Sequence, residues 1–230
     1  MLLRTIINAV FPQACLCCGI RLMHGEKYVC LRCVGSMPRP VLHGDHHDNI
    51  LARSFWSTFP IEGAATAFCY VPDDGVYSII SRMKYIRPSA ELCRYAGRLM
   101  ATENLPSRIF GEGDLLLPVP VTASHRASRG YNQSEEICRG ISEMTGLPVV
   151  TVAMWRHDSA LGQAGTARHL RMWNVCDDFV LGDTRLLEHR HVVLVDDVIT
   201  TGATIMGCLR LLGTIPGIRI SVVAFGLTRG

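Results

Sequence analysis

Runs of apolar residues alternate with polar segments along this chain, and their spacing changes between strand and helix periods. Short runs rich in β-branched residues predict strands. These strands are expected at 64–71, 115–121, 149–153, 178–181, 191–195 and 218–227. Apolar residues at helical spacing predict helices at 76–85, 89–100, 132–144 and 203–212. This β/α order predicts an α/β domain with an open, mostly parallel sheet.

One strand near the C-terminus carries an unusual pair of acids. The apolar run His191–Val195 is followed by Asp196 and Asp197, then by Val198–Ile199 and Thr200–Thr204. We expect the strand to end at the two acids. The acids and the Thr/Gly segment would then lie between the carboxyl end of a strand and the start of a helix, where open α/β sheets bind ligands.

The Thr/Gly segment suits a phosphate group. The backbone N–H groups of Thr201, Gly202, Ala203 and Thr204 would be unpaired at the helix start and would point outward at the positive end of the helix dipole. Gly202 allows a close backbone approach, and the hydroxyls of Thr200, Thr201 and Thr204 add donors. Two adjacent carboxylates can accept hydrogen bonds from the vicinal hydroxyls of a ribose. The pattern predicts a ribose 5-phosphate site, and the alternative is an ordinary strand–turn–helix with a solvated Asp cap.

Cysteines are concentrated near the N-terminus. Of the ten in the chain, five lie between residues 15 and 33, and four of these form the pairs Cys15/Cys18 and Cys30/Cys33. Two C-x-x-C pairs at this spacing predict a structural zinc site with four sulfur ligands, and a redox dithiol is the alternative. Cys17 is a spare thiol that could replace a neighbour. The cysteines beyond residue 33 are expected to be buried as small hydrophobic residues.

These patterns divide the chain into a zinc-finger segment, 1–45, and a second domain, 46–230. The Pro-, His- and Asp-rich stretch 36–50 is expected to be a linker. Its histidines could bind a metal, but a solvated loop is the favoured interpretation. They are His43, His46 and His47.

Cationic residues gather in two further segments. The first, 122–133, carries Arg126 and Arg129 and is expected to be a shaped loop between a strand and a helix. The second, 156–171, combines small residues with Arg168, Arg171 and other cations. Small residues beside cations predict a loop that closes over an anion.

Composition narrows the function classes only a little. The net charge is +3 and does not demand a polyanionic partner. Lys27 and Lys84 are the only lysines, so arginine carries most of the positive charge, either for phosphate contacts or because of codon usage. Apolar runs are too short to span a bilayer, and we expect no stable membrane insertion. The first twelve residues predict a short amphipathic helix rather than a signal peptide.

Taken in order, the motifs resemble those of the competence protein F family, over nearly the whole chain. The resemblance depends on the cysteine pairs and on five further matches. These are Met83-Lys84-Tyr85, Leu117-Pro118-Val119-Pro120, Arg129-Gly130-Tyr131-Asn132-Gln133, the residues Gln163, Arg171 and Asn174-Val175, and the string 192–204. The last of these is similar to the phosphoribosyl pyrophosphate (PRPP) signature of type I phosphoribosyltransferases. The chain departs from the family at Gly162 and Leu170, where members often have Thr and Glu.

The resemblance implies a type I phosphoribosyltransferase-like domain behind a four-cysteine zinc finger. It implies a PRPP-like ligand with Mg²⁺ on its pyrophosphate, where Arg168 or Arg171 would neutralise charge. It also implies a cytoplasmic protein that assists natural transformation by handling incoming single-stranded DNA, together with DNA-uptake proteins. Cations and aromatics near the pocket are candidate DNA contacts. They are Arg82, Lys84, Arg126, Arg129 and Tyr131.

Two other functions remain open on the sequence. An active phosphoribosyltransferase would transfer the sugar from PRPP to a nucleobase-like acceptor. Asp196 and Asp197 would then hold the ribose hydroxyls while the protein stabilises an oxocarbenium-like transition state. A PRPP-sensing regulator is the third possibility. As the alternative to DNA contact, Arg82, Arg126 and Arg129 would only line the pyrophosphate site.

Overall fold

The computed structural model describes residues 13–42, 45–86, 88–104, 108–158 and 178–228. Its centre is a parallel four-stranded sheet in the order β1-β6-β5-β2. The strands are β1 (Gly63–Tyr70), β2 (Leu115–Pro118), β5 (His191–Ile199) and β6 (Arg219–Thr228). Two short strands pair antiparallel beside it, β3 (Met154–Arg156) and β4 (Phe179–Leu181). The predicted α/β class with a mostly parallel sheet is confirmed.

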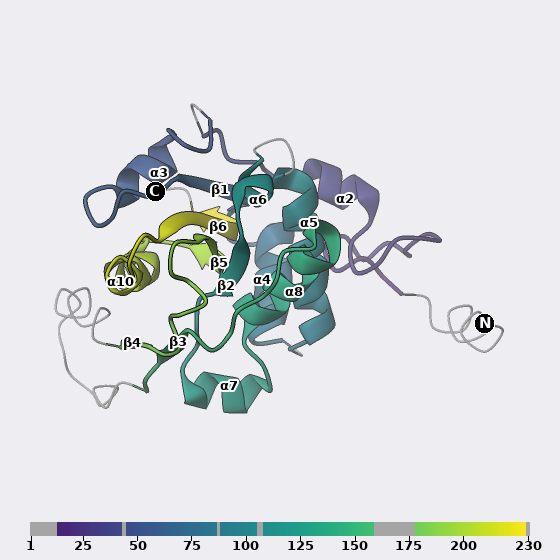
Figure 1. Cartoon of the computed structure of the whole chain (residues 1–230). Coiled ribbons are helices and arrows are strands. Elements are labelled where there is room, and N and C mark those ends of the chain that lie inside the picture. The colour runs from purple at the N-terminus through teal and green to yellow at the C-terminus, as the bar shows by residue number, and fades with distance from the viewer. Residues whose placement is uncertain (1–12, 43–44, 87, 105–107, 159–177, 229–230) are drawn as a thin grey trace, which may run out of the picture.

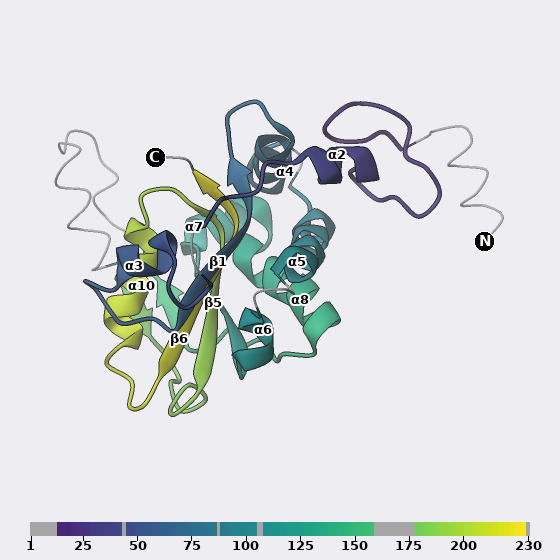
Figure 2. The same ribbon diagram turned by 90° about the horizontal axis from the view of Figure 1, so that it is seen from above.

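Helices cover both faces of the sheet (Figures 1 and 2). One face packs against α4 (Gly75–Lys84), α5 (Ala90–Asn104) and α8 (Gln133–Thr145), and the other against α3 (Ile50–Phe55) and α10 (Ala203–Leu212). Side chains of β5 alternate between the two layers, with Val193 and Val195 in one core cluster and Val192 and Leu194 in the other. A strand buried on both faces explains why this run is continuously apolar.

Close helix packing fixes the position of α8. Gly97 of α5 and Gly140 of α8 face each other, and a Cβ at either position would overlap the backbone of the other helix. The start of α8 is also defined, because the Asn132 side chain accepts a hydrogen bond from the Ser134 N–H. The expected helix is therefore confirmed, with Asn132 as its cap.

Three sequence expectations need correction. The strand β5 does not end at the acids but continues to Ile199, because Val198 and Ile199 remain paired with β6. Residues 149–153 form a single parallel bridge from Val149 to Leu116 instead of a strand. The expected loop at 122–133 contains the helix α7 (Ala123–Arg129), whose N-terminus is capped by Thr122.

The cysteine-rich segment contains the short helix α2 (Leu31–Ser36) and packs against α4 and α5 (Figure 2). Lys27 pairs with Glu91 at 2.7 Å, and Arg39 pairs with Glu103 at 2.7 Å. A further short helix, α6 (Ile109–Glu112), precedes β2. The division of the chain at residues 45 and 46 stays a prediction.

Some predicted features lie outside the described residues. They are the N-terminal helix, Cys176, most of the segment 156–171 and both Arg168 and Arg171. The cysteines at 69, 93, 138 and 208 are buried as expected. Within the described part of the chain, every helix is too short or too polar to cross a lipid bilayer.

Candidate functional site

The two acids of β5 are neighbours in the strand, but their side chains have different partners. Asp197 contacts Lys84 of α4, and Asp196 contacts Ser134 of α8. Both acids are buried. The structure therefore gives each carboxylate its own surroundings, which the spacing of the sequence alone did not indicate.

Asp197 forms an ion pair with Lys84 at the end of α4. The Lys84 Nζ lies 2.9 Å from Oδ1 and 2.8 Å from Oδ2 of Asp197, and the side chains are only 19% and 8% exposed. Burial works against the charged amine, but the Asp197 carboxylate outweighs it and raises the pKa of Lys84. Lys84 therefore keeps its positive charge, and the pair links α4 to the carboxyl end of β5.

Asp196 has no cation as its direct partner among the described residues. Its Oδ1 accepts hydrogen bonds from the Ser134 hydroxyl at 3.2 Å and from the Asp197 N–H at 2.8 Å. Burial, followed by the neighbouring Asp197 charge, raises the pKa of Asp196 to about 7, against the opposing effects of Lys84 and these hydrogen bonds. Asp196 can thus exist as an acid or as a carboxylate near neutral pH.

The Thr/Gly segment lies directly beside Asp196. Asp196 and residues 198–205 line one small cavity of about 30 Å³. Gly202 is the N-cap of α10 with a φ of +76°, a left-handed conformation that suits glycine. Gly202 offers no side-chain cap, and the Ala203 N–H donates only a long hydrogen bond, 3.4 Å, to the Thr201 hydroxyl, so the start of the helix can still donate to an external acceptor. The predicted residues Thr200–Thr204 are therefore brought together with one of the two acids.

Two of the family-like motifs, 83–85 and 129–133, pack against each other next to this site. The Tyr131 hydroxyl donates to the Met83 carbonyl at 2.9 Å, and the Arg129 guanidinium lies 5.5 Å from the centre of the Tyr85 ring. These contacts hold the end of α4, and with it Lys84, against the connection between α7 and α8. Tyr131 was predicted as a DNA contact, and the structure shows that it also has a packing role.

The predicted cations are placed unequally. Arg126 lies 3.4 Å from Glu135 and its side chain is 61% exposed. Arg129 contacts Tyr85, and Lys84 is held by Asp197. Arg168 and Arg171 lie outside the described residues. The structure therefore brings Lys84 to the acids and leaves Arg126 and Arg129 on the neighbouring surface.

Sequence reasoning missed two residues of this region. Ser134 was not among the predicted site residues, yet its hydroxyl donates a hydrogen bond to Asp196. Tyr85 was noted only as part of a motif, yet 72% of the residue is exposed beside Arg129. A tyrosine directly after the last turn of an amphipathic helix is a signal that could have pointed to an exposed aromatic.

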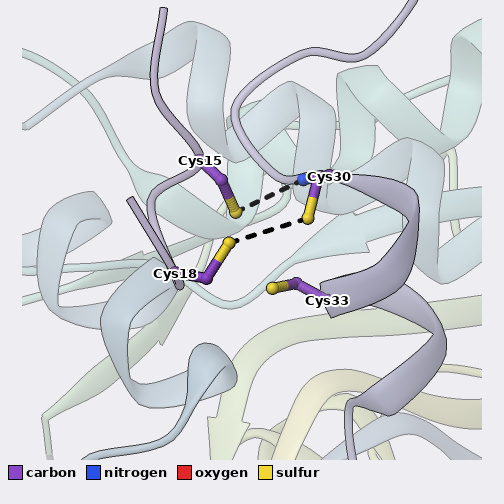
Figure 3. A group of neighbouring side chains, drawn as sticks. All are labelled: Cys15, Cys18, Cys30 and Cys33. Atoms are coloured by element: carbon purple, nitrogen blue, oxygen red, sulfur yellow. Dashed lines mark hydrogen bonds between the residues drawn. The ribbon is translucent and has the colours of Figure 1, made fainter. Parts of the chain in front are cut away.

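The four cysteines predicted as metal ligands meet in space (Figure 3). The sulfur atoms of Cys15, Cys18, Cys30 and Cys33 all lie within 4.8 Å of one another. The Sγ atoms of Cys18 and Cys30 are 3.8 Å apart, and tetrahedral zinc with Zn–S bonds of about 2.3 Å requires a separation of about 3.8 Å. The donor set therefore fits a metal ion with four thiolate ligands.

Backbone groups support thiolate formation in this cluster. The Sγ of Cys15 accepts hydrogen bonds from the Cys17 and Cys30 N–H groups, both at 3.4 Å. Burial disfavours the Cys15 thiolate, but these N–H groups outweigh it and lower its pKa to about 6. Cys17 points away, with its Sγ 3.7 Å from the Gly75 carbonyl and its pKa raised to about 12, mainly by burial. The spare thiol is therefore not part of the cluster.

Comparison with known proteins identifies relatives along most of the chain. The DNA utilization protein YhgH of Escherichia coli (strain K12) is 26% identical over 211 residues, covering 87% of this chain and 91% of the relative. The protein of the same name from Salmonella typhi is 25% identical over the same shares. Competence protein F of Haemophilus influenzae is 31% identical over 100 residues, covering 43% of this chain and 44% of that protein. No protein-family model matches the chain.

Solved structures with partial similarity are phosphoribosyltransferases. A glutamine PRPP amidotransferase from B. subtilis, complexed with ADP and GMP, has a TM-score of 0.40 and 20% identity, and the match covers 66% of this chain and 27% of that one. This chain thus spans about a quarter of the amidotransferase. The hypoxanthine phosphoribosyl transferase of Trypanosoma cruzi has a TM-score of 0.36 and 18% identity, over 59% of this chain and 65% of that one. From its sequence relatives, the chain is a homologue of DNA utilization protein YhgH and of competence protein F, as its motifs indicated.

Proposed function

We propose that this protein binds a ribose phosphate, with PRPP and its Mg²⁺ as the expected form, at the carboxyl end of β5. The observation that carries the proposal is the shared cavity of Asp196 and the Thr200–Thr204 segment. Hydrogen-bond donors for a phosphate and a carboxylate acceptor for sugar hydroxyls lie next to each other there, at the start of a ten-residue helix. This combination matches the two ends of a sugar phosphate.

The size of the cavity decides how such a ligand would bind. A volume of about 30 Å³ is close to that of one water molecule, so it accommodates a phosphate oxygen but not a sugar. The sugar would lie at the mouth, where Thr200 and Thr201 are exposed. We assign the ribose hydroxyl contacts to Asp196 and to Asp197, whose carboxylate Lys84 already holds. Mg²⁺ would be held by pyrophosphate oxygens, with Arg168 and Arg171 as further charge partners.

Isothermal titration calorimetry with ribose 5-phosphate and with PRPP plus Mg²⁺ tests this proposal. Asp196→Asn keeps the size of the side chain but removes its charge, and we expect an affinity loss of at least tenfold. Asp183→Asn is a matched control, because Asp183 is an exposed acid whose partner is Arg185. Unchanged affinity in Asp196→Asn, or no binding by the wild-type protein, would contradict the proposed site.

We further propose that the protein acts on single-stranded DNA in the cytoplasm, as part of DNA uptake or use. Support comes from the names of its relatives and from the exposed Tyr85 beside Arg129, with Arg126 on the same helix as Arg129. Aromatic rings bind bases by stacking, and arginines bind phosphates, so this surface suits a single strand of any sequence. DNA-uptake proteins are the expected partners.

A filter-binding titration tests the DNA interaction. Tyr85→Ala should weaken single-stranded DNA binding by about 5-fold to 150-fold, which corresponds to about 1–3 kcal/mol per stacked base. Arg126→Ala with Arg129→Ala should also reduce the salt dependence, because fewer counterions are released. Arg185→Ala, at an exposed arginine paired with Asp183, is the control. If the affinity for single-stranded DNA changes neither with salt concentration nor in the Tyr85 and arginine variants, this surface does not bind DNA.

We assign zinc to the cysteine cluster. Four thiolates at tetrahedral spacing are typical of structural zinc sites, which have no open coordination position. The metal would hold a segment that has few buried apolar residues of its own. Its role is therefore to fix the cysteine-rich segment against α4 and α5 rather than to take part in a reaction.

A further inference from the structure

A second group of metal-binding side chains lies at the amino ends of the strands, away from Asp196. His46 and His47 from the segment before α3 meet Glu112 at the end of α6. The Oε2 atom of Glu112 lies 3.1 Å from the Nε2 of His46 and 3.5 Å from the Nε2 of His47. A tetrahedral metal with bonds of about 2.0–2.1 Å to nitrogen and oxygen requires ligand separations of about 3.3–3.4 Å. The observed distances bracket this value.

The histidines are held in place by the backbone of β1 and the residue before it. The His47 Nδ1 lies 2.8 Å from the Glu62 carbonyl, and a carbonyl can only accept, so Nδ1 donates and the neutral ring has its lone pair on Nε2. This arrangement is the usual outer contact of a metal-bound histidine. The Ala64 N–H donates to the His46 carbonyl at 2.8 Å, and a side chain at Gly63 would collide with that carbonyl.

The group lies in the wall of an open cavity with a volume of about 570 Å³. Its wall includes Thr66 and Arg108 as well as the three ligand candidates. The Thr66 hydroxyl is fully buried, the residue is only 6% exposed, and this oxygen has no hydrogen-bond partner. An unpaired buried hydroxyl in a cavity wall costs free energy unless a bound molecule satisfies it.

We propose that His46, His47 and Glu112 form a second metal site, for a divalent transition metal such as Zn²⁺. Two imidazoles and one carboxylate form a donor set that favours transition-metal ions over Mg²⁺ and Ca²⁺. Three protein ligands leave a fourth position for a solvent or anion oxygen from the cavity. The site is independent of the ribose-phosphate site and of the cysteine cluster.

The simpler interpretation of these residues is a solvated linker with a surface His–Glu ion pair. The structure does not favour a solvated linker, because the His46 side chain is only 8% exposed. An ion pair alone needs one histidine, whereas here both rings converge on one carboxylate oxygen, with ring centres 3.9 Å apart.

Metal stoichiometry of the full chain tests the site. After removal of all metal and titration with Co²⁺ under reducing conditions, we expect two ions per chain. The cysteine cluster gives thiolate-to-cobalt charge-transfer absorption, and the second site does not. His46→Gln with His47→Gln should lose one ion and keep the charge-transfer band. Glu112→Gln preserves side-chain size and should weaken the second site by at least tenfold.

His157→Ala, at an exposed histidine outside the group, should retain both ions. Circular dichroism checks that each variant is folded. The proposal fails if the folded wild-type chain binds a single ion, or if both the histidine and the Glu112 variants still bind two ions with unchanged affinity. The charge-transfer band distinguishes this outcome from loss of metal at the cysteine cluster, because only the thiolate ligands produce the band.

Discussion

The raised pKa of Asp196 predicts a specific dependence of stability on pH. This carboxyl has a pKa of about 7 in the folded protein and 3.8 as the reference for the unfolded chain. Between these values the folded state binds more protons than the unfolded state, so the free energy of unfolding falls as the pH rises. From pH 5 to pH 8 the loss assigned to Asp196 is on the order of 3 kcal/mol, at 1.36 kcal/mol per pKa unit.

Asp196→Asn removes this titration while keeping the local hydrogen bonds. The Ser134 hydroxyl and the Asp197 N–H both donate to Oδ1, and an asparagine Oδ1 accepts both. The variant should therefore lose the fall in stability assigned to Asp196 and be more stable than the wild-type protein at pH 8. At the same pH it should bind ribose 5-phosphate less tightly, because the charged hydroxyl acceptor is gone.

Urea unfolding of both proteins at pH 5 and pH 8, with metal loaded, measures the effect. Other titrating groups, including the cysteines and histidines, are shared by the two proteins and cancel in the comparison. The difference between wild-type and variant stability should change by about 3 kcal/mol across this range. If the two proteins show parallel pH dependences, Asp196 is not the buried, proton-binding carboxyl described here.

Two further predictions concern the contacts around these sites. Lys84→Met should destabilise the protein by about 3–5 kcal/mol in urea unfolding at pH 8, because Asp197 is left buried without its cation. Lys84→Arg should recover most of this loss. Equal stability of the wild-type protein and both variants would show that the pair is not buried in solution. Cys30→Ser should lower the zinc content per chain and the thermal stability, whereas Cys17→Ser should leave the zinc content unchanged because the Cys17 thiol faces the Gly75 carbonyl. Equal zinc loss in the two variants would place Cys17 among the ligands.

The local patterns of the sequence were sufficient for the main strands and helices around the parallel sheet and for the two short motifs, although they missed α3, α6 and α7 and predicted a strand at 149–153 that is only a bridge. A continuous apolar run identified β5, and helical spacing identified α4 and α10. The cysteine pairs predicted their own cluster, because a C-x-x-C turn brings two sulfurs together whatever surrounds it. The neighbouring residues Thr200–Thr204 likewise form the turn at the start of α10 by local geometry alone.

Tertiary structure decided everything that depends on which distant residues meet. The sequence could not show that Asp197 pairs with Lys84, 113 positions away, or that Ser134 reaches Asp196. It also could not show that His46 is buried against Glu112, because nothing local distinguishes that histidine from one in a solvated linker. Periodicity shows on which side of its helix or strand a residue lies. Burial and charge pairing depend instead on how elements that are remote in sequence pack together.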